Sequence, residues 1–123
     1  MATTAMPSRP EELRDRTKQF AVRVVKMVRT LPKSDEARVL GKQVLRSGTS
    51  VAANHRAVCR ARSQADFVSK LAVVTEEVDE TVFWLELLID TGIVAKPRME
   101  NLLTEANELT RIFGSSLHTA RSK

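Results

Sequence analysis

Residues 67–89 read FVSKLAVVTEEVDETVFWLELLI, and their pattern gives the clearest indication of the fold class. Its apolar residues recur every three or four positions, which is the period of one face of an α-helix. Seven side chains form this stripe: Phe67, Leu71, Val74, Val78, Val82, Leu85 and Ile89. A serine at position 63 suits a helix N-cap and Gly92 suits a helix stop. The pattern therefore predicts a helix over about 64–91.

Three further amphipathic segments surround this one, and they predict helices over about 10–31, 35–61 and 97–119. Ser8 is a candidate cap for the first of them, and Ser34 or Asp35 for the second. Four amphipathic helices with short connections predict the all-α class, as an antiparallel up-down-up-down four-helix bundle. We expect residues 1–123 to form this single domain.

Size and composition agree with one helical domain. The chain has 123 residues, of which 42% are apolar, and it contains four glycines, four prolines and no tyrosine. Such usage favours helices over sheets. No stretch approaches the roughly eighteen apolar residues that cross a bilayer, and residues 1–10 lack the apolar centre of a secretion signal. We therefore expect a cytoplasmic protein without membrane contact.

Two glycines interrupt the second predicted helix beside its apolar face. Gly41 and Gly48 each cost about 1 kcal/mol relative to alanine inside a helix. Their placement indicates close approach of another helix, and a kink at Gly48 is the competing interpretation.

Positive charge is concentrated in the first half of the chain. The net charge is +5, yet residues 1–62 hold 14 Lys and Arg against 5 Asp and Glu, and residues 63–123 hold 6 against 10. Residues 37–65 contain no acidic residue at all. A segregated positive field of this kind favours a polyanionic partner.

Five cations form a basic stripe on the outer face of the second predicted helix: Arg38, Lys42, Arg46, Arg56 and Arg60. Like charges four residues apart repel, and phosphates would offset the repulsion while releasing counterions. The stripe therefore predicts binding to the backbone of RNA or DNA. The absence of tyrosine and the few phenylalanines argue against a base-stacking platform.

Three alternatives to nucleic acid remain open for the basic stripe, of which the simplest is an ordinary solvated helix face. It could pair, within the bundle or across a subunit boundary, with the acidic residues of the third predicted helix: Glu76, Glu77, Asp79, Glu80, Glu86 and Asp90. It could also dock an acidic protein, in which case the chain is a protein-interaction scaffold.

The third predicted helix has a second apolar side, which is formed by Val73, Phe83, Trp84 and Leu87 and lies away from its core stripe. We predict a subunit interface there, and the alternative is that Trp84 wraps round the core edge.

The residues that carry chemistry form no catalytic or metal-binding pattern. His55 and His118 lack the glutamate three positions earlier that a di-iron bundle needs. The lone Cys59 is predicted to be a small buried hydrophobe, and Ser47 and Asn54 to hydrogen-bond between helices or across an interface. We expect no metal, no cofactor and no enzyme activity.

Several segments together resemble one known family. They are residues 45–54 (LRSGTSVAAN), Phe67, Lys70, Leu71, residues 80–88 (ETVFWLELL) and residues 105–109 (EANEL). They are similar to the bacterial four-helix bundle proteins that include those encoded by intervening sequences of 23S ribosomal RNA genes. The resemblance extends from about residue 13 to residue 117.

This resemblance implies an antiparallel bundle that assembles as a ring, with a homopentamer expected. It also implies a distant similarity to the accessory variability determinant of diversity-generating retroelements, which works with a reverse transcriptase and nucleic acid through a basic surface. The residues at the matching positions are those of the basic stripe. The resemblance thus adds a reverse transcriptase to RNA and DNA as expected partners.

Overall fold

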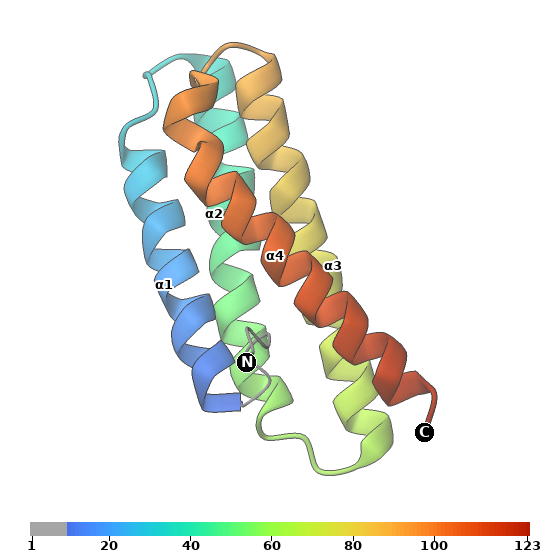
Figure 1. Cartoon of the computed structure of the whole chain (residues 1–123). Helices are drawn as coiled ribbons and strands as arrows, with labels where there is room; N and C mark the ends of the chain where they lie inside the picture. Colours follow the sequence, from blue (N-terminus) through green and yellow to red (C-terminus); the bar gives the residue numbers. More distant parts are fainter. Residues whose placement is uncertain (1–9) are drawn as a thin grey trace.

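The chain folds into four antiparallel helices in a computed structural model that describes residues 10–123. The helices are α1 (Pro10–Arg29), α2 (Asp35–Val58), α3 (Gln64–Asp90) and α4 (Lys96–Arg121), and the described residues contain no strand. They run alternately up and down, so α1 begins and α4 ends at the same end of the bundle (Figure 1). The predicted all-α, up-down-up-down four-helix bundle is confirmed. The expected cap Ser8 lies outside the described residues.

Local hydrogen bonds decide where the helices begin and end. The hydroxyl of Ser34, and not Asp35, accepts from the Ala37 amide at 3.2 Å, and Ser63 accepts from the Asp66 amide at 3.0 Å. The chain leaves α3 through Gly92, whose φ of +77° suits a residue without Cβ. α4 begins at residue 96, one position before the predicted start.

α1 and α2 end two or three residues before their predicted ends. Behind each of them the backbone tightens, because the amides of Thr30, Leu31, Arg60 and Ala61 donate to the carbonyl three residues earlier. Such tightened turns are frequent at helix C-termini. The last residues of the predicted helices therefore lie in these turns.

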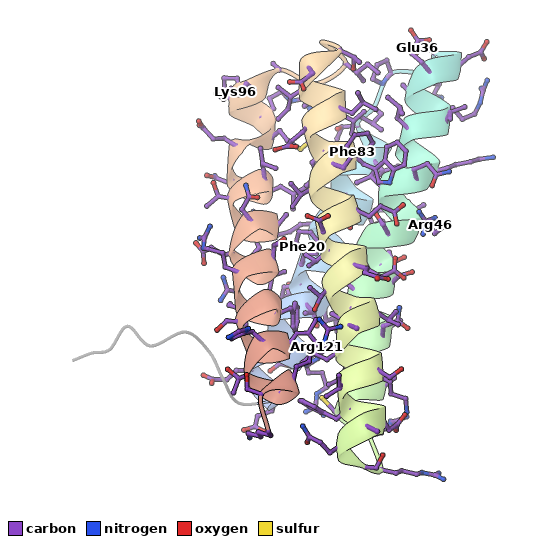
Figure 2. All side chains as sticks on the ribbon, turned by 90° about the vertical axis from the view of Figure 1, so that its right-hand side faces the viewer. Phe20, Glu36, Arg46, Phe83, Lys96 and Arg121 are labelled. Atoms are coloured by element: carbon purple, nitrogen blue, oxygen red, sulfur yellow. The ribbon has the colours of Figure 1, made fainter. Side chains whose placement is uncertain are left out.

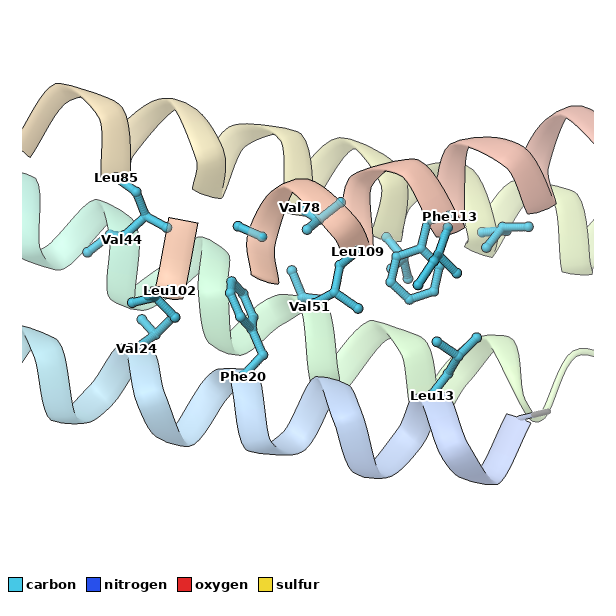
Figure 3. Close-up of a cluster of buried hydrophobic side chains, with 14 of the residues drawn as sticks. Leu13, Phe20, Val24, Val44, Val51, Val78, Leu85, Leu102, Leu109 and Phe113 are labelled. Atoms are coloured by element: carbon cyan, nitrogen blue, oxygen red, sulfur yellow. The ribbon is translucent and has the colours of Figure 1, made fainter. Parts of the chain in front are cut away.

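The four apolar stripes meet in one core along the axis of the bundle (Figure 3). Every predicted core residue of α4 is buried, from Leu102 to Leu117. In α3 the burial is rotated slightly from the predicted stripe, because Leu88 is fully buried whereas Val82 and Ile89 are half-buried. The core reaches both ends of the helices, so the bundle is packed throughout its length.

Glycines bring α1 and α2 close together. A Cβ at Gly48 would lie 2.9 Å from both methyl carbons of Val24, and a Cβ at Gly41 would lie 3.0 Å from a methyl carbon of Leu31. α2 runs through both glycines as one continuous helix. The close-approach interpretation of these glycines is confirmed.

Polar side chains set the register between α2 and α3. The hydroxyls of Ser47 and Thr81 are fully buried and hydrogen-bonded to each other at 2.9 Å. The Asn54 amide donates to a carboxylate oxygen of Glu77 at 3.2 Å. The predicted use of Ser47 and Asn54 between helices is confirmed, because a buried hydroxyl needs such a partner.

A partly buried ion pair joins α1 and α4, whose packing against each other is the least extensive of any two neighbouring helices. Arg16 donates to both carboxylate oxygens of Glu105, at 2.7 and 2.8 Å, and to Glu108 at 2.6 Å. Mainly through the bond to Glu105, these contacts raise the pKa of Arg16 above its ordinary value. The Arg16 charge is thus paired within the bundle.

Among residues 10–123, no helix combines the length and apolarity needed to cross a membrane.

Candidate functional site

The structure divides the predicted basic stripe into three parts. All five of its side chains are exposed, four of them on α2 and Arg60 in the turn that follows it. Arg38 and Lys42 lie near the start of α2, on the side that faces α1, whereas Arg46 turns toward α3. Arg56 and Arg60 lie where α2 ends. The stripe is therefore three local environments.

Arg46 is paired with the acidic helix. It forms an ion pair with Glu80, and its second terminal nitrogen lies 3.7 Å from a carboxylate oxygen of Glu77. Figure 2 shows Arg46 on the side of the bundle where α2 and α3 meet. Burial raises the pKa of Glu77, and the Arg46 charge acts in the opposite direction. For Arg46, the alternative of pairing with the third helix is the one observed.

Arg56 and Arg60 join two further cations at the connection between α2 and α3. Together they surround a shallow open depression, which we call the basic hollow: Ala53, Arg56, Ala57, Arg60, Arg62 and Lys70. Its floor is made by two alanines, and the lining described by the structure includes no carboxylate. Small residues between cations leave room for an anion to approach several of them at once.

One acidic residue lies close to the basic hollow and neutralises part of its charge. The Lys70 ammonium lies 3.0 Å from a carboxylate oxygen of Asp66, and the Arg62 backbone amide donates to the same oxygen at 3.2 Å. These hydrogen bonds, Lys70 first, lower the pKa of Asp66, so it stays ionised. The charge of Arg62 also contributes to the lowered pKa of Asp66, whereas no ion pair of Arg56 or Arg60 is found within residues 10–123. Arg56 and Arg60 are therefore the cations of the hollow that are most open to an external anion.

The first turns of α2 form a different surface together with α1. We call it the basic-rimmed groove, and its ten lining residues are Val28, Arg29, Leu31, Pro32, Lys33, Ala37, Arg38, Gly41, Lys42 and Leu45. Six of these are apolar or glycine and four are cationic, and none is acidic. Arg38 forms an ion pair with Asp35, one turn earlier. Unlike the basic hollow, the groove offers an apolar floor.

The predicted interface residues form an α3 face, which comprises Val73, Phe83, Trp84 and Leu87. Phe83 is 53% exposed and Val73 is 43% exposed, whereas Trp84 and Leu87 are half-buried. The Trp84 indole donates to Glu80 at 2.9 Å, and its ring meets Phe83 edge-on with centroids 4.9 Å apart. Trp84 also packs against the core, as the core-edge alternative expects. Among residues 10–123, Phe83 is thus the largest of four exposed large apolar side chains, the others being Val22, Val39 and Val73.

A small apolar pocket lies at the end of the bundle where α1 begins and α2 ends, and residues of all four helices line it. His55 is buried there against Phe113, with ring centroids 5.6 Å apart. Burial, with a smaller contribution from Arg14, lowers the pKa of His55, so its ring is neutral. Residues 10–123 hold no group of three or more potential metal ligands.

Cys59 is exposed, so the prediction that it is buried is wrong. α2 ends at Val58 and Cys59 is its C-cap, one residue past the last core position. Its sulfur lies 3.9 Å from Nδ1 of His55, a distance that allows a weak hydrogen bond between the two side chains.

Sequence reasoning missed part of this site. Arg62 belongs to the acid-free run of residues 37–65, and Lys70 is the single cation of α3. Both signals are visible in the sequence, but only the turn between α2 and α3 brings them beside Arg56 and Arg60. The groove carries no such signal, because its two walls come from different helices.

Comparisons with known proteins place the chain next to one group. A family model described as 23S rRNA-intervening sequence protein matches residues 11–115. A crystal structure from Bacteroides thetaiotaomicron, titled as a protein with unknown function from the S23 ribosomal protein family, is 36% identical with a TM-score of 0.81. The match covers 89% of this chain and 97% of that one. No curated protein gives a significant match.

Proposed function

The chain belongs to the 23S rRNA-intervening sequence protein family, and from that premise we propose that it is a nonenzymatic, oligomeric cytoplasmic protein that binds the phosphate backbone of RNA or DNA. The basic hollow is the observation that carries the proposal. Binding rests on Arg56, Arg60, Arg62 and Lys70, which gather where α2 ends and α3 begins, whereas Arg38, Lys42 and Arg46 of the predicted stripe lie outside the basic hollow, nearer the start of α2.

The charges of the basic hollow favour an external anion. Arg56 lies in the last turn of α2 and Arg60 in the tightened turn behind it, so two like charges that repel each other line the same hollow. A phosphate placed between them removes this repulsion and releases condensed counterions. Arginine also binds phosphate through two parallel N–H donors. A bound phosphate would therefore both reduce the repulsion between the two arginines and accept hydrogen bonds from them.

The same lining favours the backbone over the bases. Its floor consists of Ala53 and Ala57, and no aromatic side chain is among the residues that line the hollow. Stacking platforms for single strands need aromatic rings. We therefore expect affinity that depends strongly on salt and weakly on sequence.

Self-association is the second part of the proposal. Phe83 and Val73 expose apolar surface on α3 that the subunit does not cover. Exposed patches of this kind are typical of contact sites. We expect a homo-oligomer, and a homopentamer is the state that the resemblance implies. A reverse transcriptase partner stays a prediction of the distant retroelement similarity.

The test is a fluorescence anisotropy titration with a labelled structured RNA and a DNA duplex of equal length, at low and near-physiological salt. The variant Arg56→Gln, Arg60→Gln, Arg62→Gln should bind at least about tenfold more weakly, and its salt slope should fall by about three. The salt slope falls because each lost arginine removes one phosphate contact.

The matched control is Arg98→Gln, Arg111→Gln, Arg121→Gln, which removes the same charge from exposed positions of α4. It should bind within about twofold of the wild type if contacts are local. Equal losses in both variants would mean that net charge alone attracts the nucleic acid. A wild type that binds neither ligand would remove the nucleic-acid proposal.

The second candidate is a protein-interaction scaffold, and the pairing of Arg46 with Glu77 and Glu80 favours it. That pairing shows that one stripe residue already has carboxylate partners. A scaffold purified from cells should carry no bound nucleic acid at any salt concentration. A nucleic-acid binder should carry absorbance near 260 nm that high salt removes.

A further inference from the structure

We propose that the basic-rimmed groove of one subunit receives the α3 face of a second copy of this chain, so that subunits assemble head to tail. The inference rests on the proposed self-association and assigns the two surfaces that make the contact. Phe83 is the side chain that enters the groove. Each subunit then carries one donor surface and one acceptor surface.

The two surfaces complement each other in apolar character. The groove has a floor of aliphatic side chains, including Leu31, Pro32 and Leu45. Phe83 is more than half exposed and is held edge-on by Trp84, which is itself fixed to Glu80. A rigid aromatic side chain beside an open aliphatic groove is a typical pair of interface anchor and pocket.

The surroundings of these surfaces have opposite charge. The groove is rimmed by Arg29, Lys33, Arg38 and Lys42. α3 carries seven carboxylates and one lysine. Four of those carboxylates are exposed within two helical turns of Phe83: Glu76, Asp79, Glu86 and Asp90. Head-to-tail contact brings the acidic surround of one subunit against the basic rim of the next.

The two surfaces also lie at the same height along the bundle. The bond between Ser47 and Thr81 fixes the register of α2 against α3. Leu45 of the groove lies two residues before Ser47, and Phe83 of the α3 face lies two residues after Thr81. Because α2 and α3 are antiparallel, both residues are displaced in the same direction along the bundle axis and lie at one height. Rotation about an axis parallel to the helices keeps every surface at its height. Complementary surfaces at one height can therefore close a ring.

Other occupants fit these surfaces less well. Pairing two α3 faces with each other would bring like carboxylates together, which costs binding energy. A nucleic acid would match the cations of the rim and leave the aliphatic floor of the groove unused. A second copy is the occupant that satisfies both the floor and the rim.

The experiment mixes two variants and measures mass by light scattering after size exclusion. Phe83→Asp removes the donor surface, and Lys33→Glu with Lys42→Glu reverses the rim of the acceptor surface. All three positions are exposed, so the fold should persist, and circular dichroism checks it. Each variant alone should have the mass of one chain. An equimolar mixture should have the mass of two, because one intact contact remains.

The mixture is measured at about tenfold higher concentration than the wild type needs, because a single contact lacks the avidity of a closed ring. A second variant, Asp79→Lys with Glu86→Lys, should restore larger assemblies when combined in one chain with Lys33→Glu and Lys42→Glu. This rescue separates charge complementarity from general damage.

The remaining outcomes count against the inference in different ways. A monomeric wild type overturns the proposed self-association together with this contact. A monomeric Phe83→Asp beside a fully assembled rim variant leaves self-association standing and removes the groove as its acceptor. A rim variant that keeps its mass and loses RNA binding assigns the groove to phosphate. Two monomeric variants that form no heterodimer exclude head-to-tail assembly.

Discussion

Near its first turns α2 lines a groove with Leu45 in its floor, and at its last turns it lines a hollow with only Ala53 and Ala57 between the charges. Both regions carry four cations and no lining carboxylate within the described chain. Apolar floor favours an apolar partner side chain, whereas a floor of small residues between arginines favours a phosphate. Positive charge alone therefore does not identify the ligand of either region.

The middle of α2 keeps the two regions apart. Arg46 lies between them and is occupied by Glu77 and Glu80 of α3. A row of like charges that is neutralised at its centre acts as two separate patches. This arrangement permits one helix to serve two partners.

The largest expected effect is a double dissociation between the two ends of α2. The variant Arg56→Gln, Arg60→Gln, Arg62→Gln should lose about tenfold to hundredfold in RNA affinity and keep the mass of the wild type. Lys33→Glu with Lys42→Glu should lose the assembly and keep its affinity, within about threefold, for a hairpin short enough to reach one subunit. Light scattering measures the mass of each variant, and fluorescence anisotropy measures its affinity for RNA.

Loss of both properties in either variant would show that the two ends act together as one surface. In that case assembly and nucleic-acid binding would be coupled. The comparison between groove and hollow would then fail.

The next effect concerns the contact between Gly48 of α2 and Val24 of α1, the two helices that form the walls of the groove. At Gly48 a new methyl group would meet the stiff, branched Val24 side chain at 2.9 Å, so Gly48→Ala should lower the free energy of unfolding by about 1–2 kcal/mol. Pushing α1 from α2 should also weaken assembly while the hollow stays intact. Urea unfolding followed by circular dichroism measures the change in stability.

Gly114→Ala is the control, since no atom lies within 4 Å of a Cβ at that position of α4. It should raise the free energy of unfolding by about 0.5–1 kcal/mol, because alanine favours the helix. A stabilising Gly48→Ala would mean that α1 and α2 have more room than their contact indicates.

The smallest effect is a dependence on pH that arises beside the hollow end of α2. The pKa of His55 in the folded chain lies below its ordinary value of about 6.5, first because the ring is buried. Above about pH 6.5 both states are neutral and His55 costs no stability. As the pH falls below that value the unfolded chain takes up a proton that the folded chain does not, so stability declines. The limiting slope is about 1.4 kcal/mol per pH unit.

Urea unfolding between pH 7.5 and pH 5.5, at about half-unit steps, should show this decline in the wild type. The variant His55→Gln should lack it, although its overall stability will be lower because a buried side chain changes. Comparing the slopes cancels the carboxylates, including Glu77, whose raised pKa acts in the opposite direction. Parallel slopes in the two proteins would mean that His55 titrates alike in the folded and unfolded states.

Local sequence patterns were enough to predict the helices, their order and most of the core. Periodicity is a local property, so the spacing from Phe67 to Ile89 was enough to place α3, and the caps Ser34 and Ser63 act on their own first turns. Where a helix end depended on backbone tightening, the prediction ran too long. For the same reason Cys59 was wrongly placed in the core.

Which charges share a surface depends on how the helices pack against one another. Five stripe residues are equivalent on a helical projection, yet α1 and α3 flank α2 on different sides and give each cation different neighbours. Lys70 reaches the hollow because the chain turns between α2 and α3, and the charge of Arg16 is paired by the carboxylates of α4. Contacts between residues distant in the chain depend on packing, which local periodicity does not encode.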